Sequence, residues 1–162
     1  MATMSPSTPS SESQLVTVTH WIDGRPWEGT PARWGAIFDP ATGRHTARVA
    51  FADAALVDAA VTAASRAAAA WRSSSLAQRA AVMFAYRELL NRHKREVAEV
   101  ITREHGKVLP DAVGEVTRGL EVVEFACGLP QLLKGALSEA VSTAVDSYSI
   151  PPPLGVVAAI TP

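Results

Sequence analysis

The stretch that decides the fold class is an apolar run near the end of the chain, Leu154-Gly155-Val156-Val157-Ala158-Ala159-Ile160. A surface strand of an antiparallel sheet alternates apolar and polar residues, whereas a strand covered by helices on both sides is apolar throughout. Three prolines, Pro151–Pro153, precede the run and predict an extended connector. We therefore predict an α/β fold in which 154–162 begins a parallel sheet that the chain does not complete.

Immediately upstream, the pattern predicts a pair of short strands. Leu137–Val141 and Val145–Ile150 are separated by Ser142–Ala144. The two strands are close enough to form one hairpin between 134 and 153.

Further upstream the hydrophobic period changes to that of helices. Asp53 is a plausible N-cap for a helix that reaches about Trp71, and Ser75 with Gln78 forms a capping-box pattern. The helix that Ser75 opens is expected to reach Glu104, with Asn91–Lys94 as the place where a bend would fall. The third predicted helix runs from Asp111 to about Gly128, and its apolar face carries Val113, Val116, Leu120, Val123 and Cys127.

The beginning of the chain reads as a tail followed by strands. Residues 1–14 are rich in Ser, Thr and Pro, and we expect them to be disordered. Order should begin with a strand from Leu15 to Ile22 that ends at the hairpin signal Asp23-Gly24. Strands at Trp34–Phe38 and Thr46–Phe51 should follow, separated by a turn at 39–43.

Composition excludes several classes of function. The 162 residues carry a formal net charge of −1 with mixed signs, so no basic surface is indicated for nucleic acid or an anionic membrane. The one cysteine, Cys127, excludes an internal disulfide and favours a reducing, cytoplasmic location. The four histidines show no metal-like spacing, and we expect no metal site.

The segments Gly114–Gly128, Leu132–Gly135 and Val145–Ser149 resemble methylmalonate-semialdehyde dehydrogenases. Pro153–Pro162 resembles the entry into the cofactor domain of aldehyde dehydrogenases generally, and Glu104–Lys107 fits the same superfamily. Two departures occur: Pro151-Pro152 replace the usual Arg-Gln pair, and Ala159 stands where glycine is common.

The resemblance implies a fold. It is the N-terminal part of the aldehyde dehydrogenase fold, with β-hairpins and three long helices leading into an incomplete Rossmann-like NAD domain. Residues 15–133 would be the N-terminal part of the NAD-binding domain and 134–153 the hairpin arm of the oligomerisation domain. Residues 154–162 would be the first, truncated strand of the Rossmann-like core.

The resemblance also implies an activity. It is the NAD-dependent, CoA-acylating oxidation of methylmalonate or malonate semialdehyde to propionyl-CoA or acetyl-CoA with loss of CO2, in valine and related catabolism. The implied partners are the semialdehyde, coenzyme A and further copies of the chain, bound through 134–153. The family's nucleophilic cysteine, oxyanion-hole asparagine and pyrophosphate-binding turn lie beyond residue 162. We therefore expect no catalytic residue in this chain and no activity from the chain alone.

Two residues carry candidate binding roles. From spacing alone, Arg118 could pair with Glu115 and Glu121 on a solvated face. The resemblance instead matches it to a helix arginine that holds the substrate carboxylate. The resemblance also places Thr161 beside the nicotinamide half of NAD, although an ordinary strand-to-loop threonine is the alternative. Cys127 lies on the predicted apolar face and is expected to pack rather than react.

Two other functions stay open on the sequence alone. One is a truncated, non-catalytic interaction module. The other is a fragment of a different aldehyde dehydrogenase.

Overall fold

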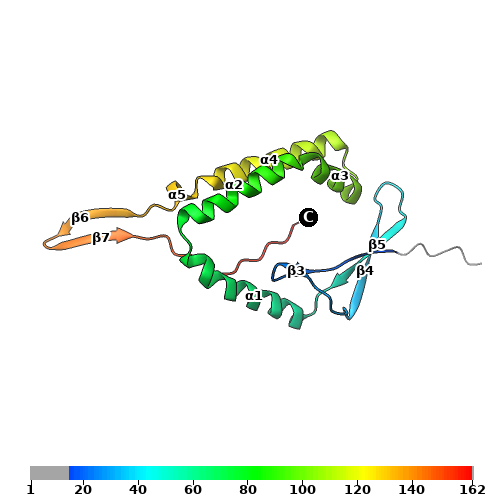
Figure 1. Cartoon of the computed structure of the whole chain (residues 1–162), viewed down its shortest axis with the longest axis horizontal. Helices are drawn as coiled ribbons and strands as arrows, with labels where there is room; N and C mark the ends of the chain where they lie inside the picture. Colours follow the sequence, from blue (N-terminus) through cyan, green and yellow to red (C-terminus); the bar gives the residue numbers. More distant parts are fainter. Residues whose placement is uncertain (1–14, 162) are drawn as a thin grey trace, which may run out of the picture.

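The N-terminal strands form where β-branched and aromatic residues alternate. The computed structural model describes residues 15–161, so the tail predicted at 1–14 lies outside the described residues. A three-stranded sheet has the order β1 (Val16–Val18), β5 (His45–Phe51), β4 (Arg33–Phe38), with β1 parallel and β4 antiparallel to β5. These strands lie at one end of the molecule (Figure 1).

Two turns in this region confirm the sequence prediction. β2 (Trp21–Ile22) and β3 (Arg25–Pro26) are joined by Asp23 and Gly24, both with positive φ, as a tight hairpin turn requires. In the turn before β5, Asp39 accepts hydrogen bonds from the Ala41 amide at 2.8 Å and the Thr42 hydroxyl at 2.8 Å. Both turns are therefore closed by contacts only a few residues apart in the sequence.

The helices begin at the predicted caps. Asp53 accepts the Leu56 amide at 2.8 Å and caps α1 (Ala54–Ser73), and Ser75 and Gln78 form the complete capping box of α2 (Leu76–Arg92). The helix predicted to reach Glu104 is divided at His93, within the bend predicted at Asn91–Lys94, and continues as α3 (Lys94–His105), which ends at the left-handed Gly106. α4 (Leu109–Cys127) and the short α5 (Leu129–Leu132) follow, so residues 15–161 hold four long helices rather than the predicted three.

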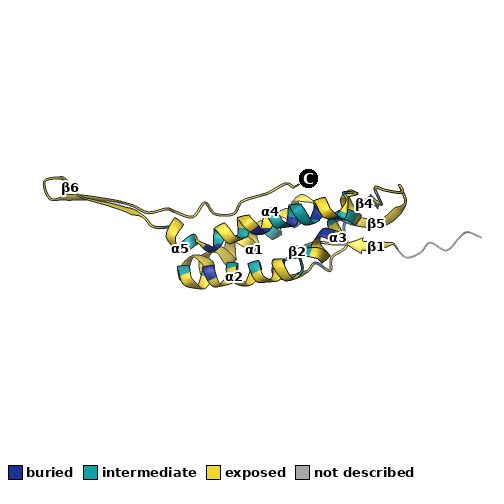
Figure 2. Ribbon diagram, turned by 90° about the horizontal axis from the view of Figure 1, so that it is seen from above, coloured by how far each residue is buried: buried dark blue, intermediate teal, exposed yellow. Residues whose placement is uncertain are grey.

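The core of the described chain is small and lies where α4 packs against α2 and α3 (Figure 2). Ala98, Ala112 and Val116 form its buried centre, and Leu90, Ile101, Leu109 and Val113 pack around them. Two alanines at the centre let the helix backbones approach closely. α1 contributes no buried residue, and its larger apolar side chains Val57, Val61 and Trp71 are 51 %, 45 % and 50 % exposed in the described chain.

A hairpin made of β6 (Ala136–Ser142) and β7 (Val145–Ser149) extends away from the helices (Figure 1). The chain then returns past α1, where Gly155–Val157 lie opposite the C-terminal half of that helix (Figure 1). The strand predicted at 154–160 is not formed, and Ile160 is fully exposed. A strand needs a neighbouring strand for its backbone hydrogen bonds, and no described segment pairs with this one.

Candidate functional site

α4 has two faces, and the candidate site lies on the outer one. Its buried face carries Ala112, Val116, Leu120 and Cys127. Arg118 follows Val116 by two residues and therefore lies about 200° around the helix from it. Val122 and Phe125, at helical spacing from Arg118, are 69 % and 68 % exposed. Arg118 is thus a cation on a partly apolar surface.

The Arg118 guanidinium makes only a loose contact within the described chain. Its side chain is 69 % exposed, and Nη2 lies 3.8 Å from Glu115 Oε1, which is too far for a hydrogen bond. Nη1 lies over Gly114, where an added Cβ would stand 3.8 Å away. The predicted ion-pair array is therefore only partly formed, since no pair with Glu121 is found among the described residues.

Glu115 has a stronger partner than Arg118. Lys107, between α3 and α4, donates a hydrogen bond to the same Oε1 of Glu115. The Lys107 side chain is 24 % exposed and that of Glu115 is 39 % exposed. The Lys107 hydrogen bond, together with the charges of Lys107, Arg118 and His105, lowers the pKa of Glu115. Sequence reasoning missed this contact, although Lys107 belongs to a segment that it singled out.

Thr161 lies on a different segment from Arg118. It is exposed, and no hydrogen bond or ion pair joins it to Arg118 within the described chain. Upstream of it, Gly155–Val157 face α1 across a groove of about 660 Å³. The α1 side of this groove is lined by Ala64, Ala67, Ala68, Ala70 and Trp71. The groove is apolar and therefore offers contact area rather than charge.

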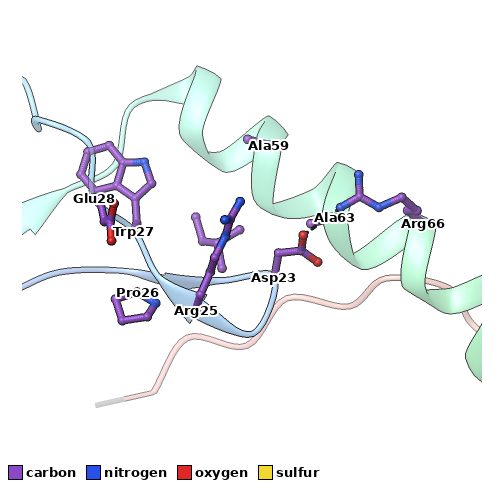
Figure 3. Close-up of a pocket in the computed structure, with 9 residues that line it drawn as sticks. Asp23, Arg25, Pro26, Trp27, Glu28, Ala59, Ala63 and Arg66 are labelled. Atoms are coloured by element: carbon purple, nitrogen blue, oxygen red, sulfur yellow. Dashed lines mark hydrogen bonds and ion pairs between the residues drawn. The ribbon is translucent and has the colours of Figure 1, made fainter.

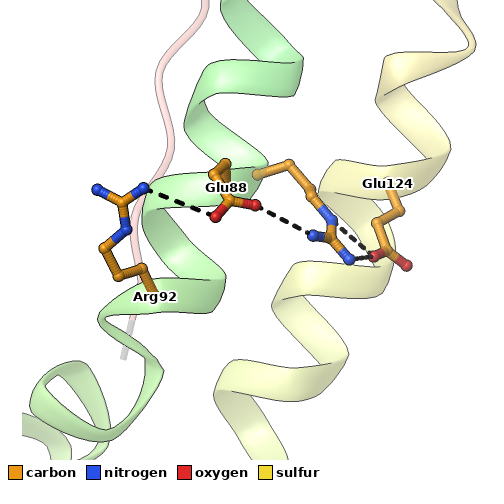
Figure 4. Close-up of polar contacts among 4 residues, drawn as sticks. Glu88, Arg92 and Glu124 are labelled. Carbon is orange, nitrogen blue, oxygen red and sulfur yellow. Dashed lines mark hydrogen bonds and ion pairs between the residues drawn. The ribbon is translucent and has the colours of Figure 1, made fainter.

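Cys127 is buried, as predicted. It borders a hollow of about 410 Å³ whose wall includes Phe84 and the pair Arg87–Glu124. Glu124 Oε1 accepts hydrogen bonds from Arg87 Nε at 2.9 Å and Nη2 at 2.6 Å, which ties α2 to α4 (Figure 4). The hydrogen bond to Glu124 also raises the pKa of Arg87. The surroundings of Cys127 are those of a packed thiol beside an interhelix ion pair.

Another hollow, of about 410 Å³, lies between the β2–β3 hairpin and α1 (Figure 3). Arg66 of α1 pairs with Asp23 of the hairpin turn at 3.0 Å. Arg25 and Glu28 also line the hollow, so its charges are of both signs. This exposed ion pair joins the hairpin to α1.

Two features are absent from the residues that the structure describes. No group of three or more His, Cys, Asp or Glu side chains there is arranged to hold a metal ion. No helix there combines the length and apolar character needed to cross a membrane.

Residues 27–162 match the model of the aldehyde dehydrogenase family. The chain belongs to the aldehyde dehydrogenase family. Its α/β architecture matches the N-terminal region of aldehyde dehydrogenase structures, which confirms the predicted fold class.

Relatives confirm the predicted resemblance. A malonate-semialdehyde dehydrogenase of Pseudomonas aeruginosa is 40 % identical over 90 % of this chain and 29 % of its own length. The mitochondrial, acylating methylmalonate-semialdehyde/malonate-semialdehyde dehydrogenase of Mus musculus is 40 % identical over 99 % of this chain and 30 % of its own. A Sinorhizobium meliloti protein assigned as a methylmalonate-semialdehyde dehydrogenase, solved in complex with NAD, superposes with a TM-score of 0.84 at 41 % identity, over 89 % of this chain and 29 % of that one. This aldehyde dehydrogenase chain thus spans under a third of the length of these relatives.

Proposed function

We propose that this chain is the N-terminal part of an NAD-dependent, CoA-acylating methylmalonate- or malonate-semialdehyde dehydrogenase. The observation that carries the proposal is the Arg118 guanidinium, which is exposed on the outer face of α4 and has no partner at hydrogen-bond distance among the described residues. A malonate semialdehyde carries a carboxylate at one end and the reacting aldehyde at the other. Arg118 would hold the carboxylate and so fix the position of the aldehyde.

The surroundings of Arg118 favour this role. An arginine fork binds a carboxylate through two parallel hydrogen bonds. Val122 and Phe125 on the same face would exclude water once substrate and the rest of the enzyme cover them, which strengthens a charged contact. A solvated ion pair on the surface needs no such apolar neighbours.

Thr161 is the residue of this chain that we propose for cofactor contact. NAD, when bound, supplies the acceptor for the hydride that leaves the aldehyde carbon. The exposed Thr161 hydroxyl fits a polar contact with a cofactor at this end of the chain. The coenzyme A that would accept the acyl group is part of the same proposal.

We further propose that the β6–β7 arm, 134–153, joins subunits of a homo-oligomer. Among the described residues its two strands pair only with each other. Leu137, Val141 and Tyr148 are 64 %, 55 % and 73 % exposed. Unpaired strand edges with apolar side chains recruit other chains. Deletion of 136–149 should therefore reduce self-association in analytical ultracentrifugation, and unchanged association would count against the arm.

A cytoplasmic location completes the proposal. The buried, free thiol of Cys127 suits a reducing compartment. Cell fractionation of the source organism with an antibody to this chain would test it.

The test of substrate binding is Arg118→Leu in a full-length enzyme that carries this chain, for example joined to the remainder of the Pseudomonas aeruginosa relative. For malonate semialdehyde, loss of a charged hydrogen-bonded contact should lower kcat/KM by about 30- to 1000-fold. Propanal has no carboxylate, so its kcat/KM should change by less than about threefold.

Arg95→Leu is the matched control, because Arg95 is an exposed arginine of α3 that pairs with Glu99 at 2.9 Å. It should leave both substrates within about twofold, as expected for an exposed pair. Equal large losses for both substrates with Arg118→Leu would show a disturbed helix. No loss for either substrate would show that Arg118 does not bind the carboxylate.

A further inference from the structure

Two cations, Lys107 just before α4 and Arg118 within it, lie near one carboxylate oxygen of Glu115. Lys107 donates to Glu115 Oε1, and Arg118 Nη2 lies 3.8 Å from the same atom. The three side chains differ in exposure: 24 % for Lys107, 39 % for Glu115 and 69 % for Arg118. Lys107, the less exposed cation, makes the hydrogen bond to Glu115, whereas Arg118, the more exposed cation, makes none.

This arrangement prevents a competing pair. Glu115 and Arg118 are three residues apart on a helix, a spacing at which Glu–Arg pairs form readily. A strong pair would bring the guanidinium to about 2.7–2.9 Å from the carboxylate, commonly with two hydrogen bonds. The observed 3.8 Å is well beyond that range.

We propose that Lys107 and Glu115 are positioning residues for substrate selection: Lys107 holds Glu115 and so keeps the Arg118 guanidinium available to an incoming carboxylate. The inference rests on the proposed function of Arg118. Without Lys107, Glu115 becomes an internal carboxylate that turns to Arg118 and competes with the substrate. Without both, the competitor is gone and Arg118 is available again.

The charges around Glu115 agree with this division of roles. Its pKa is lowered first by the hydrogen bond from Lys107, then by the charge of Lys107, and less by Arg118 and His105. Arg118 is thus the smaller of the two principal cationic influences on Glu115. Its donors have no hydrogen-bond acceptor in the described chain and can serve a ligand.

The kinetic test compares Lys107→Met with the double variant Lys107→Met/Glu115→Gln in the full-length enzyme described above. Lys107→Met should raise KM for malonate semialdehyde about three- to fivefold, the factor that an exposed ion pair can impose. Its kcat, and both constants for propanal, should stay within about twofold. The double variant should recover the original KM. Lys94→Met, which removes another lysine charge, is the control and should change neither substrate.

Each other outcome overturns the inference. Equal losses for both substrates would give Lys107 a role in folding alone. A raised KM that persists in the double variant would mean that Lys107 itself contacts the carboxylate. No change would mean that Glu115 does not compete. A failure of the proposed function shows separately, as an Arg118→Leu substitution that does not lower kcat/KM for malonate semialdehyde more than for propanal.

A second measurement does not depend on how Lys107→Met folds. The side-chain carboxyl of Glu115 can be titrated by ¹³C NMR in the 162-residue chain and in its Arg118→Leu variant. If Lys107 is the main partner of Glu115, the titration midpoint of Glu115 should remain below the ordinary value of 4.5 in the Arg118→Leu variant. A return of the midpoint to 4.5 would show that Arg118, and not Lys107, stabilises the ionised carboxylate of Glu115, and the inference would fail.

Discussion

Val116 and Val122 lie about 120° apart around α4, one on the buried face and the other on the exposed face, so the same substitution at both positions measures how much of the chain's stability comes from burial. Val116 is 6 % exposed and Val122 is 69 % exposed. Replacing valine by alanine removes two carbon groups, worth about 0.8 kcal/mol each when fully buried. It also improves helix propensity by roughly 0.5 kcal/mol at both positions, and this gain cancels in the comparison.

Scaling by the difference in burial, Val116→Ala should be about 1 kcal/mol less stable than Val122→Ala. A cavity that fails to collapse would add to this difference. For a chain of this length, that corresponds to about 3 °C in the melting temperature. Val122→Ala itself should be neutral or slightly stabilising.

Urea unfolding of the 162-residue chain, followed by circular dichroism at 222 nm, is the assay. A single transition with an unchanged slope is required for the comparison. If Val122→Ala is as destabilising as Val116→Ala, the outer face of α4 is covered in solution, and the placement of Arg118 on an accessible surface is refuted.

Three further outcomes are expected. Ser75→Ala removes half of the α2 capping box and should destabilise the chain by about 1 kcal/mol, whereas Ser75→Asp, which retains a capping oxygen, should not. The Thr42 hydroxyl is the main cause that lowers the pKa of Asp39 below 3.8, so this turn is stabilised above about pH 4 and loses that contribution as pH falls through the lowered pKa. In Thr42→Val the NMR midpoint of Asp39 should move up towards 3.8, and an unmoved midpoint would contradict the assignment. The 162-residue chain should form no NADH from malonate semialdehyde or propanal with NAD and coenzyme A; turnover that Cys127→Ser abolishes would make Cys127 a nucleophile.

Features closed by local contacts were predictable from the sequence. Ser75 and Gln78 are three residues apart, and the Asp23-Gly24 turn needs only its own backbone preferences. The helix break at His93 was not predictable as a full break, because no glycine or proline marks it.

Features that depend on distant partners were beyond local reasoning. Arg87 and Glu124 are 37 residues apart and meet only because α2 packs on α4. The apolar pattern of 154–160 is typical of a buried strand, but a strand forms only beside a neighbouring strand, and the pattern does not indicate whether one is present. The spacing of Arg118 and Glu115 indicated a contact between them. That Glu115 instead bonds to Lys107 depends on the path of the chain from α3 into α4, which the spacing does not show. The roles of Arg118 and Thr161 in binding stay predictions.

His93 is the only residue between α2 and α3, so the rotation of α3 relative to α2 depends on this one residue. His93 closes α2, since its amide bonds to the Leu89 carbonyl, and it also precedes α3. Both helices pack on α4, with no linker to absorb a change in length. A deletion of one residue between His93 and Ala98 would turn the face of α3 by about 100° relative to α4. The Ala98–Ala112 contact would be lost, so this segment should tolerate substitutions far better than insertions or deletions.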